Sequence, residues 1–143
     1  MKNNASGFSL LELLLVVAII LIIATVAVPS LLRSRQAANE THAVANLKAL
    51  NTAEVQYSST LSSGFGAVPD LITAGLIDSG FAYSGGYDFV VTLSGDTLDY
   101  TATATARGAN NGRYDFYTRP DYVLRYSTDA SRAPSGLSGE PVR

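Results

Sequence analysis

The chain has 143 residues, which is enough for one ordinary domain and short of what two domains usually need. Its 10 basic and 12 acidic residues give a formal net charge of −2, without the dense basic face of a nucleic-acid-binding protein. The absence of cysteine excludes disulfides and thiolate metal sites.

The first thirty residues combine one acidic side chain with a long apolar run. Residues 7–12 read Gly-Phe-Ser-Leu-Leu-Glu, and the only polar member of the following stretch, Leu13 to Val28, is Thr25. A carboxylate inside lipid costs roughly 2.5–3.5 kcal/mol on insertion scales, so one kept here indicates a function and a partner. As a helix, residues 8–28 would span about 31 Å, close to the thickness of a bilayer core.

These residues resemble the N-terminus of a type IV pilin or of a type II secretion pseudopilin. The resemblance covers Gly7 to about Pro29 and rests on the glycine, the aromatic residue, the glutamate and the apolar run. It implies that a prepilin peptidase cuts after Gly7, removes the leader of residues 1–7 and methylates the new N-terminal residue, Phe8. It also implies that Glu12 is the assembly residue.

Two interpretations of Glu12 stay open. Its carboxylate either reaches the headgroups at the membrane edge or pairs with the cationic amine of Phe8 in a neighbouring copy. Pairing is favoured, because cleavage creates that amine four residues from the carboxylate. An ordinary signal peptide cleaved near residues 25–27 and an unprocessed membrane anchor are further alternatives, and neither explains Glu12.

The chain departs from the pattern of this family at two positions. Most relatives carry a glycine near the position of Leu21, and threonine is common where this chain has Ser9. Pro29 predicts a helix kink, because proline removes one backbone hydrogen bond and clashes with the preceding turn. Without the glycine, we expect melting only in the turn before Pro29 and a straighter rod over residues 8–28.

Residues 30–62 are predicted to continue the helix outside the membrane, since they contain no glycine or proline and are rich in good helix formers. Arg33 and Arg35 follow the membrane segment, where lipid phosphates or neighbouring acids would bind them. His42, the only histidine, is expected on the surface or at an interface. One apolar stripe needs a sheet to cover it, and its members are Val44, Leu47, Leu50, Tyr57 and Leu61.

Residues 63–86 are predicted to be a connecting loop with a short helix from Pro69 to Ala74, stopped by Gly75. Alternating residues over 87–127 predict an antiparallel sheet of about four strands. The predicted strands are 87–93, 98–106, 114–118 and 122–127. In the second, Leu98 shares the inner face with Tyr100, Ala102, Ala104 and Ala106.

Residues 128–143 lack periodicity and are expected to form a mobile tail. The fold class is therefore α+β, with a long N-terminal helix packed on a C-terminal antiparallel sheet, as in type IV pilins.

Charge is unevenly distributed along the chain. Residues 8–106 hold three basic and eight acidic side chains, whereas the segment from Arg107 onward holds six arginines and four acids. This asymmetry fits head-to-tail contacts between copies, and it also fits chance distribution over a solvated surface.

Other chemistries are weakly supported. The eight tyrosines and five phenylalanines fit sheet packing better than electron conduction. The pairs Asp96 with Asp99 and Asp70 with Asp78 could suggest calcium, but neither has the spacing of a calcium loop. No catalytic residues, metal site or cofactor are expected, so enzymatic activity is not expected.

The resemblance implies a structural subunit that polymerises with copies of itself into a type IV pilus-like surface filament, for adhesion, motility or DNA uptake. The expected partners are the prepilin peptidase, the inner-membrane pilus assembly machinery and, before assembly, membrane lipid. No specific nucleic acid is expected. The alternatives are a periplasmic pseudopilin of a type II secretion system and a low-abundance tip pilin that binds DNA or a surface.

Overall fold

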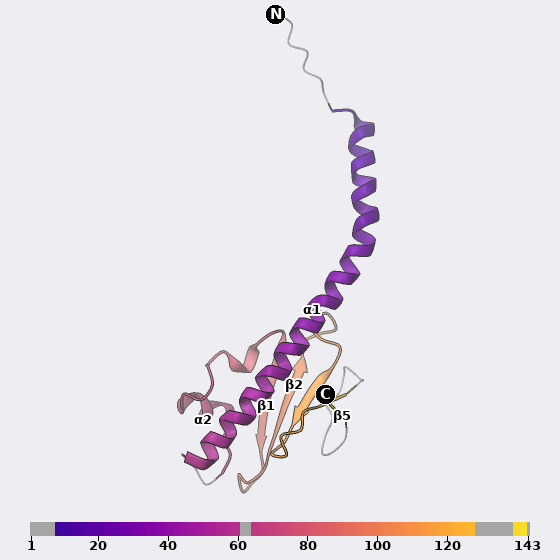
Figure 1. The fold of residues 1–143 in the computed structure, drawn as a ribbon. Helices are drawn as coiled ribbons and strands as arrows, with labels where there is room; N and C mark the ends of the chain where they lie inside the picture. The colour runs from indigo at the N-terminus through magenta and orange to yellow at the C-terminus, as the bar shows by residue number, and fades with distance from the viewer. Residues whose placement is uncertain (1–7, 61–63, 128–138, 143) are drawn as a thin grey trace, which may run out of the picture. The chain divides into compact units, whose positions relative to one another are not determined.

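The computed structural model describes residues 8–60, 64–127 and 139–142 (Figure 1). The chain forms two compact units, Met1–Ser34 and Arg35–Arg143, and the long helix α1 (Leu10–Thr60) runs through both. The second unit also contains the helix α2 (Val68–Thr73), the 3-10 helix η1 (Phe81–Tyr83) and five strands. The strands are β1 (Tyr87–Leu93), β2 (Tyr100–Ala106), β3 (Asp115–Thr118), β4 (Arg125–Ser127) and β5 (Glu140–Pro141). The α+β prediction is confirmed.

The helix α1 continues through Pro29. Proline has no N–H to donate to the Thr25 carbonyl one turn earlier. The Thr25 hydroxyl donates to the Ile22 carbonyl at 2.7 Å, which adds one local hydrogen bond in the same stretch. The melting expected before Pro29 concerns the filament and stays a prediction.

The strands form one antiparallel sheet in the order β1-β2-β3-β4-β5, so each strand pairs with the next along the chain (Figure 1). The register of β1 and β2 places Tyr87 opposite Ala106 and Leu93 opposite Tyr100. The alternation predicted for both strands is confirmed, since Tyr87 and Phe89 on β1 and Tyr100 on β2 point into the core.

The prediction for the C-terminal segment is wrong at its end. Glu140 and Pro141 form a fifth strand that pairs with Tyr126 and Arg125. A strand of two residues is too short to show alternation, and proline is tolerated there because β5 lies at the sheet edge. The rest of the predicted tail, residues 128–138 and 143, lies outside the described residues.

Three strands begin later than predicted: β3 by one residue, at Asp115, and β2 and β4 by two and three residues. The turn after β1 is closed by a 2.8 Å hydrogen bond from Ser94 N–H to the Asp99 carbonyl, so Leu98 belongs to the turn. Leu98 is consequently 65% exposed instead of lying on the inner face. The predicted strand 122–127 begins only at Arg125, because the Tyr122 N–H donates to the Arg119 carbonyl and holds residues 119–122 in a turn.

The core lies between the second half of α1 and one face of the sheet (Figure 1). Leu47 and Leu50 of the predicted stripe are buried, Val44 and Tyr57 are partly buried, and Leu61 is outside the described residues. Small side chains on both sides let helix and sheet approach closely. They are Ala43 and Ala53 on α1 and Ala102 and Ala104 on β2.

The short helix α2 confirms the element predicted after the long helix. The Asp70 carboxylate accepts a 2.9 Å hydrogen bond from the Ala67 N–H at the helix start. Gly75 follows the helix with φ of +69°, a conformation that glycine adopts without strain. Leu71 is fully buried and ties α2 to the core.

Candidate functional site

The predicted processing and assembly residues lie at the start of α1. Gly7 is outside the described residues, Phe8 is 81% exposed, and Glu12 lies in the first turn of the helix. The Leu13 N–H donates to the Ser9 carbonyl at 3.2 Å, so the helical bonding begins at Ser9. The structure therefore places the Glu12 carboxylate in the first helical turn, one turn from Phe8.

Ser9 and Glu12 also occupy the two positions of a helix N-terminal capping pattern, which the sequence analysis did not identify. Ser9 immediately precedes the helix, and Glu12 is its third residue. Serine at the N-cap with glutamate three residues later is the pattern of a capping box, in which both side chains serve backbone N–H groups. The position of Glu12 thus fits a structural role in starting the helix, besides the assembly role that the resemblance implies.

The residues after Glu12 expose an apolar surface. Seventeen large hydrophobic side chains between Phe8 and Leu32 are exposed, which is far more than a water-soluble helix leaves uncovered. By length and composition, α1 is the one helix among the described residues that could cross a membrane. Such a surface belongs in lipid or among other apolar helices.

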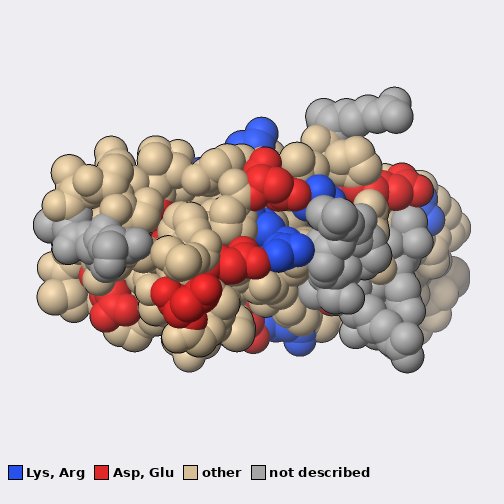
Figure 2. Space-filling view, turned by 90° about the horizontal axis from the view of Figure 1, so that it is seen from below, with Lys and Arg blue, Asp and Glu red and all other residues tan. Residues whose placement is uncertain are grey.

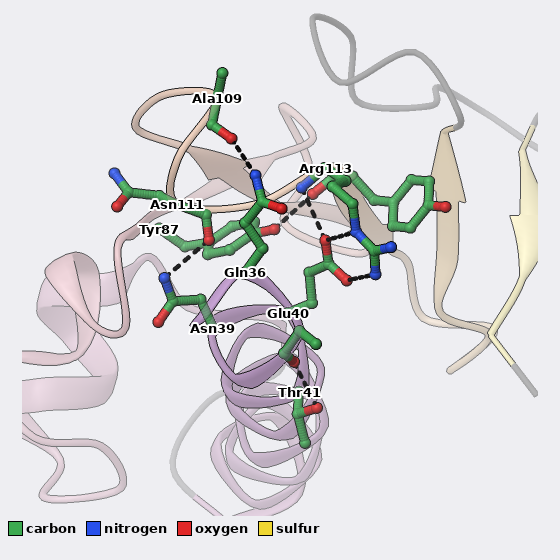
Figure 3. A network of polar contacts seen from close by, with 10 residues as sticks. Gln36, Asn39, Glu40, Thr41, Tyr87, Ala109, Asn111 and Arg113 are labelled. Atoms are coloured by element: carbon green, nitrogen blue, oxygen red, sulfur yellow. Dashed lines mark hydrogen bonds and ion pairs between the residues drawn. The ribbon is translucent and has the colours of Figure 1, made fainter. Parts of the chain in front are cut away.

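A second cluster fastens α1 to the loop between β2 and β3. Gln36, Asn39 and Glu40 project from α1 toward this loop (Figure 3), and we call these three residues the α1 clamp. The side-chain amides of Gln36 and Asn39 donate to the carbonyls of Ala109 and Asn111. The clamp thereby satisfies loop carbonyls that no strand pairs.

Glu40 makes the strongest contact of the clamp. Its Oε1 accepts hydrogen bonds from the N–H and Nε of Arg113 at 2.8 and 3.0 Å, and its Oε2 accepts one from Nη2 at 2.8 Å. A forked arginine–carboxylate pair is strong and geometrically specific. Glu40 is nearly buried while Arg113 is half exposed, so the carboxylate is satisfied inside and the guanidinium stays in contact with water.

Four arginines of the C-terminal half form ion pairs within the described part of the subunit. Ion pairs join Arg107 to Asp88, Arg113 to Glu40, Arg119 to Asp99 and Arg125 to Asp121. On the face shown in Figure 2, basic and acidic side chains adjoin one another instead of forming separate patches. For these four arginines, the charge asymmetry along the sequence is thus offset by pairing within one subunit.

Three of the four aspartates considered for calcium have other partners. Asp99 binds Arg119, Asp70 caps α2, and Asp96 accepts hydrogen bonds from Ser94 Oγ and the Leu98 N–H. No group of three or more metal-binding side chains occurs among the described residues. His42 is exposed on α1, as expected for a surface residue.

A family model for the prokaryotic N-terminal methylation motif matches residues 2–28. The type IV wide pilus major component PilA4 of Thermus thermophilus is 32% identical over 112 residues, covering 71% of this chain and 83% of that relative. The chain belongs to the type IV pilin family. No solved structure matches it. In this pilin, the matched motif contains Gly7, Phe8 and Glu12 and stops just before Pro29.

Proposed function

We propose that this pilin is a structural subunit that is cleaved after Gly7, N-methylated at Phe8 and polymerised with copies of itself into a type IV pilus-like surface filament. Before assembly it waits in the inner membrane, anchored by the first part of α1. The observation that carries the proposal is the exposed apolar surface of residues 8–32, which begins beside a single carboxylate.

The size of this apolar surface requires a covering. Burying a large hydrophobic side chain is worth roughly 1.5–3 kcal/mol, so leaving seventeen of them in water would cost on the order of tens of kcal/mol. Lipid covers them in the precursor, and the same segments of other copies cover them in the filament. Lipid tails and apolar helices are equally hydrophobic, so the transfer between them needs another source of specificity.

Glu12 supplies that specificity. Cleavage after Gly7 turns the Phe8 nitrogen into a cationic amine, and Glu12 of one copy pairs with this amine in a neighbour. The pair adds little net stability, because desolvating both charges offsets their attraction. It sets the register between copies, since any other arrangement leaves two charges unpaired in an apolar core.

Substitutions at Glu12 test this role against the capping role. Glu12→Ala and Glu12→Gln should both abolish or cripple filaments while leaving the subunit in the membrane, because both remove the charge. Glutamine can still complete a capping box, so a helix-start role predicts normal filaments from Glu12→Gln. The measurement is the yield of sheared filaments beside the amount of subunit in the membrane fraction.

Ser9→Ala is the matched control. It removes the N-cap hydroxyl and keeps the charge, so its filaments should form at close to the normal yield. Normal filament yield from Glu12→Gln together with loss in Ser9→Ala would assign Glu12 to the helix start and refute the pairing.

A further inference from the structure

Glu54 is a buried carboxylate with one unpaired oxygen. It lies near the end of α1, and its residue is 0% exposed. Its Oε2 accepts a 3.0 Å hydrogen bond from the Gly66 N–H, whereas its Oε1 has no hydrogen-bond partner within the described parts of the chain. A buried charge usually has a cation or a full set of donors, because leaving it unpaired is costly.

Among the described residues, the groups found to act on Glu54 include no positive charge. Asp70, on α2, lies near enough to repel it. Tyr100, on β2, interacts electrostatically with Glu54 and donates its hydroxyl hydrogen to Asn51 Oδ1 at 2.7 Å. The arginines that form ion pairs among the described residues are engaged elsewhere, by Glu40, Asp88, Asp99 and Asp121.

Gly66, which donates to Glu54, and the nearby Asp70 belong to residues 64–75, which we call the connecting segment. The Phe65 N–H donates to the Thr97 carbonyl at 2.8 Å, and the Phe65 ring packs edge-on against Tyr100 with 4.7 Å between centroids. Leu71 is buried in the core. Opening this segment would break the Gly66 hydrogen bond and admit water to the carboxylate.

We propose that protonation of Glu54 keeps the connecting segment closed on helix and sheet, and that ionisation of Glu54 favours its opening. Burial raises the pKa of Glu54 from the ordinary 4.5 to about 7. The hydrogen bond from Gly66 opposes this rise and the charge of Asp70 adds to it. The change therefore falls in the range between mildly acid and neutral pH.

The direction follows from proton linkage. The closed segment holds the Glu54 proton more tightly than the open one, so closure is fully favoured below about pH 4.5. This advantage is lost as the pH rises and is gone above about pH 7, where both forms are ionised. Between these limits the equilibrium constant for opening of the connecting segment rises by up to about tenfold per pH unit. The surface that the subunit presents at this segment is thus set by pH.

Amide hydrogen exchange of the full-length chain in detergent micelles tests the proposal. Exchange rates of the connecting segment are measured from pH 5 to pH 8, corrected for the intrinsic pH dependence of exchange, with β2 as the internal reference. In the unmodified protein, protection should fall between pH 5 and 7 and then level off. In Glu54→Gln, it should not depend on pH. Asp78→Asn removes an exposed acid just beyond the segment and should leave the unmodified behaviour intact.

Equal protection at pH 5 and pH 7 in the unmodified protein would overturn the proposal, as would a pH dependence retained by Glu54→Gln. If the glutamine variant does not fold, the proposal is tested by following the Gly66 amide chemical shift of the unmodified protein as the pH changes. This chemical shift should titrate with a midpoint near pH 7, and a midpoint near 4.5 would show an ordinary carboxyl group.

Discussion

At the scale of single residues, three glutamates on α1 meet three different environments. Glu12 heads an exposed apolar surface, Glu40 is held by the fork of Arg113, and Glu54 is buried with one oxygen unpaired. A carboxylate is stable inside a protein only when its charge is paired or neutralised. We therefore propose different roles for the three residues: Glu12 acts through a neighbouring copy, Glu40 through its own arginine and Glu54 through a proton.

The Glu40–Arg113 pair should contribute measurably to stability. Glu40→Ala should lower the free energy of unfolding by about 1–3 kcal/mol, because it removes three hydrogen bonds to Arg113, two of them in a forked ion pair. The measurement is chemical denaturation of the full-length chain in detergent micelles, monitored by the circular dichroism of the tyrosine side chains.

The control is Arg107→Ala. One hydrogen bond joins Arg107 to Asp88, and their side chains are 41% and 45% exposed. The loss of this ion pair should therefore cost at most about 1 kcal/mol. Equal destabilisation by the two variants would show that the α1 clamp has no special role.

At the scale of elements, the sequence predicts those helices and strands whose residue pattern continues over many residues. The long helix and the strands β1 and β2 were predictable, because helix-forming composition or alternation persists over enough residues to be read. The helix α2 was predictable from Pro69 and the stop at Gly75. The two-residue strand β5 carries no such period. Leu98 has the residue type and spacing of an inner position, yet the hydrogen bond between Ser94 and Asp99 closes the turn around it.

The same limit applies to the functional residues: a contiguous motif can be recognised in the sequence, whereas contacts between distant segments cannot. The N-terminal motif is contiguous, so the sequence alone indicates Gly7, Phe8 and Glu12 as candidates, and the family match includes these positions. Glu40 and Arg113 lie 73 residues apart, and the partners of Glu54 come from segments that only folding brings together. A single sequence contains no signal for such pairings.

The loop between β2 and β3 depends on one glycine. A side chain at Gly112 would overlap the hydroxyl of Tyr87, which donates to the Tyr114 carbonyl at 2.7 Å. Gly112→Ala should therefore displace Tyr87, break this hydrogen bond and destabilise the fold by about 1–3 kcal/mol in the same denaturation experiment.

Gly108→Ala is the matched variant, in the same loop but with open space where the added methyl group would lie. Its effect should stay within about 0.5 kcal/mol. If both alanine variants were equally tolerated, the packing of Gly112 against Tyr87 would not be a constraint.

At the scale of the whole molecule, the chain combines two units with different needs. The described part of the first unit exposes apolar side chains that need lipid or like helices, whereas the second has its own core and pairs four of its arginines internally. We expect copies to associate chiefly through the first unit, since four arginines that could have joined neighbouring second units are already paired within the described part of the subunit.

Mass spectrometry of sheared and purified surface filaments tests the central proposal most directly. The dominant subunit should begin at Phe8, carry one methyl group on its terminal amine and extend through the rest of the chain. Filaments whose dominant subunit is a different protein, with this chain present in trace amounts or absent, would contradict the proposal. That result would favour a tip pilin or a periplasmic pseudopilin instead.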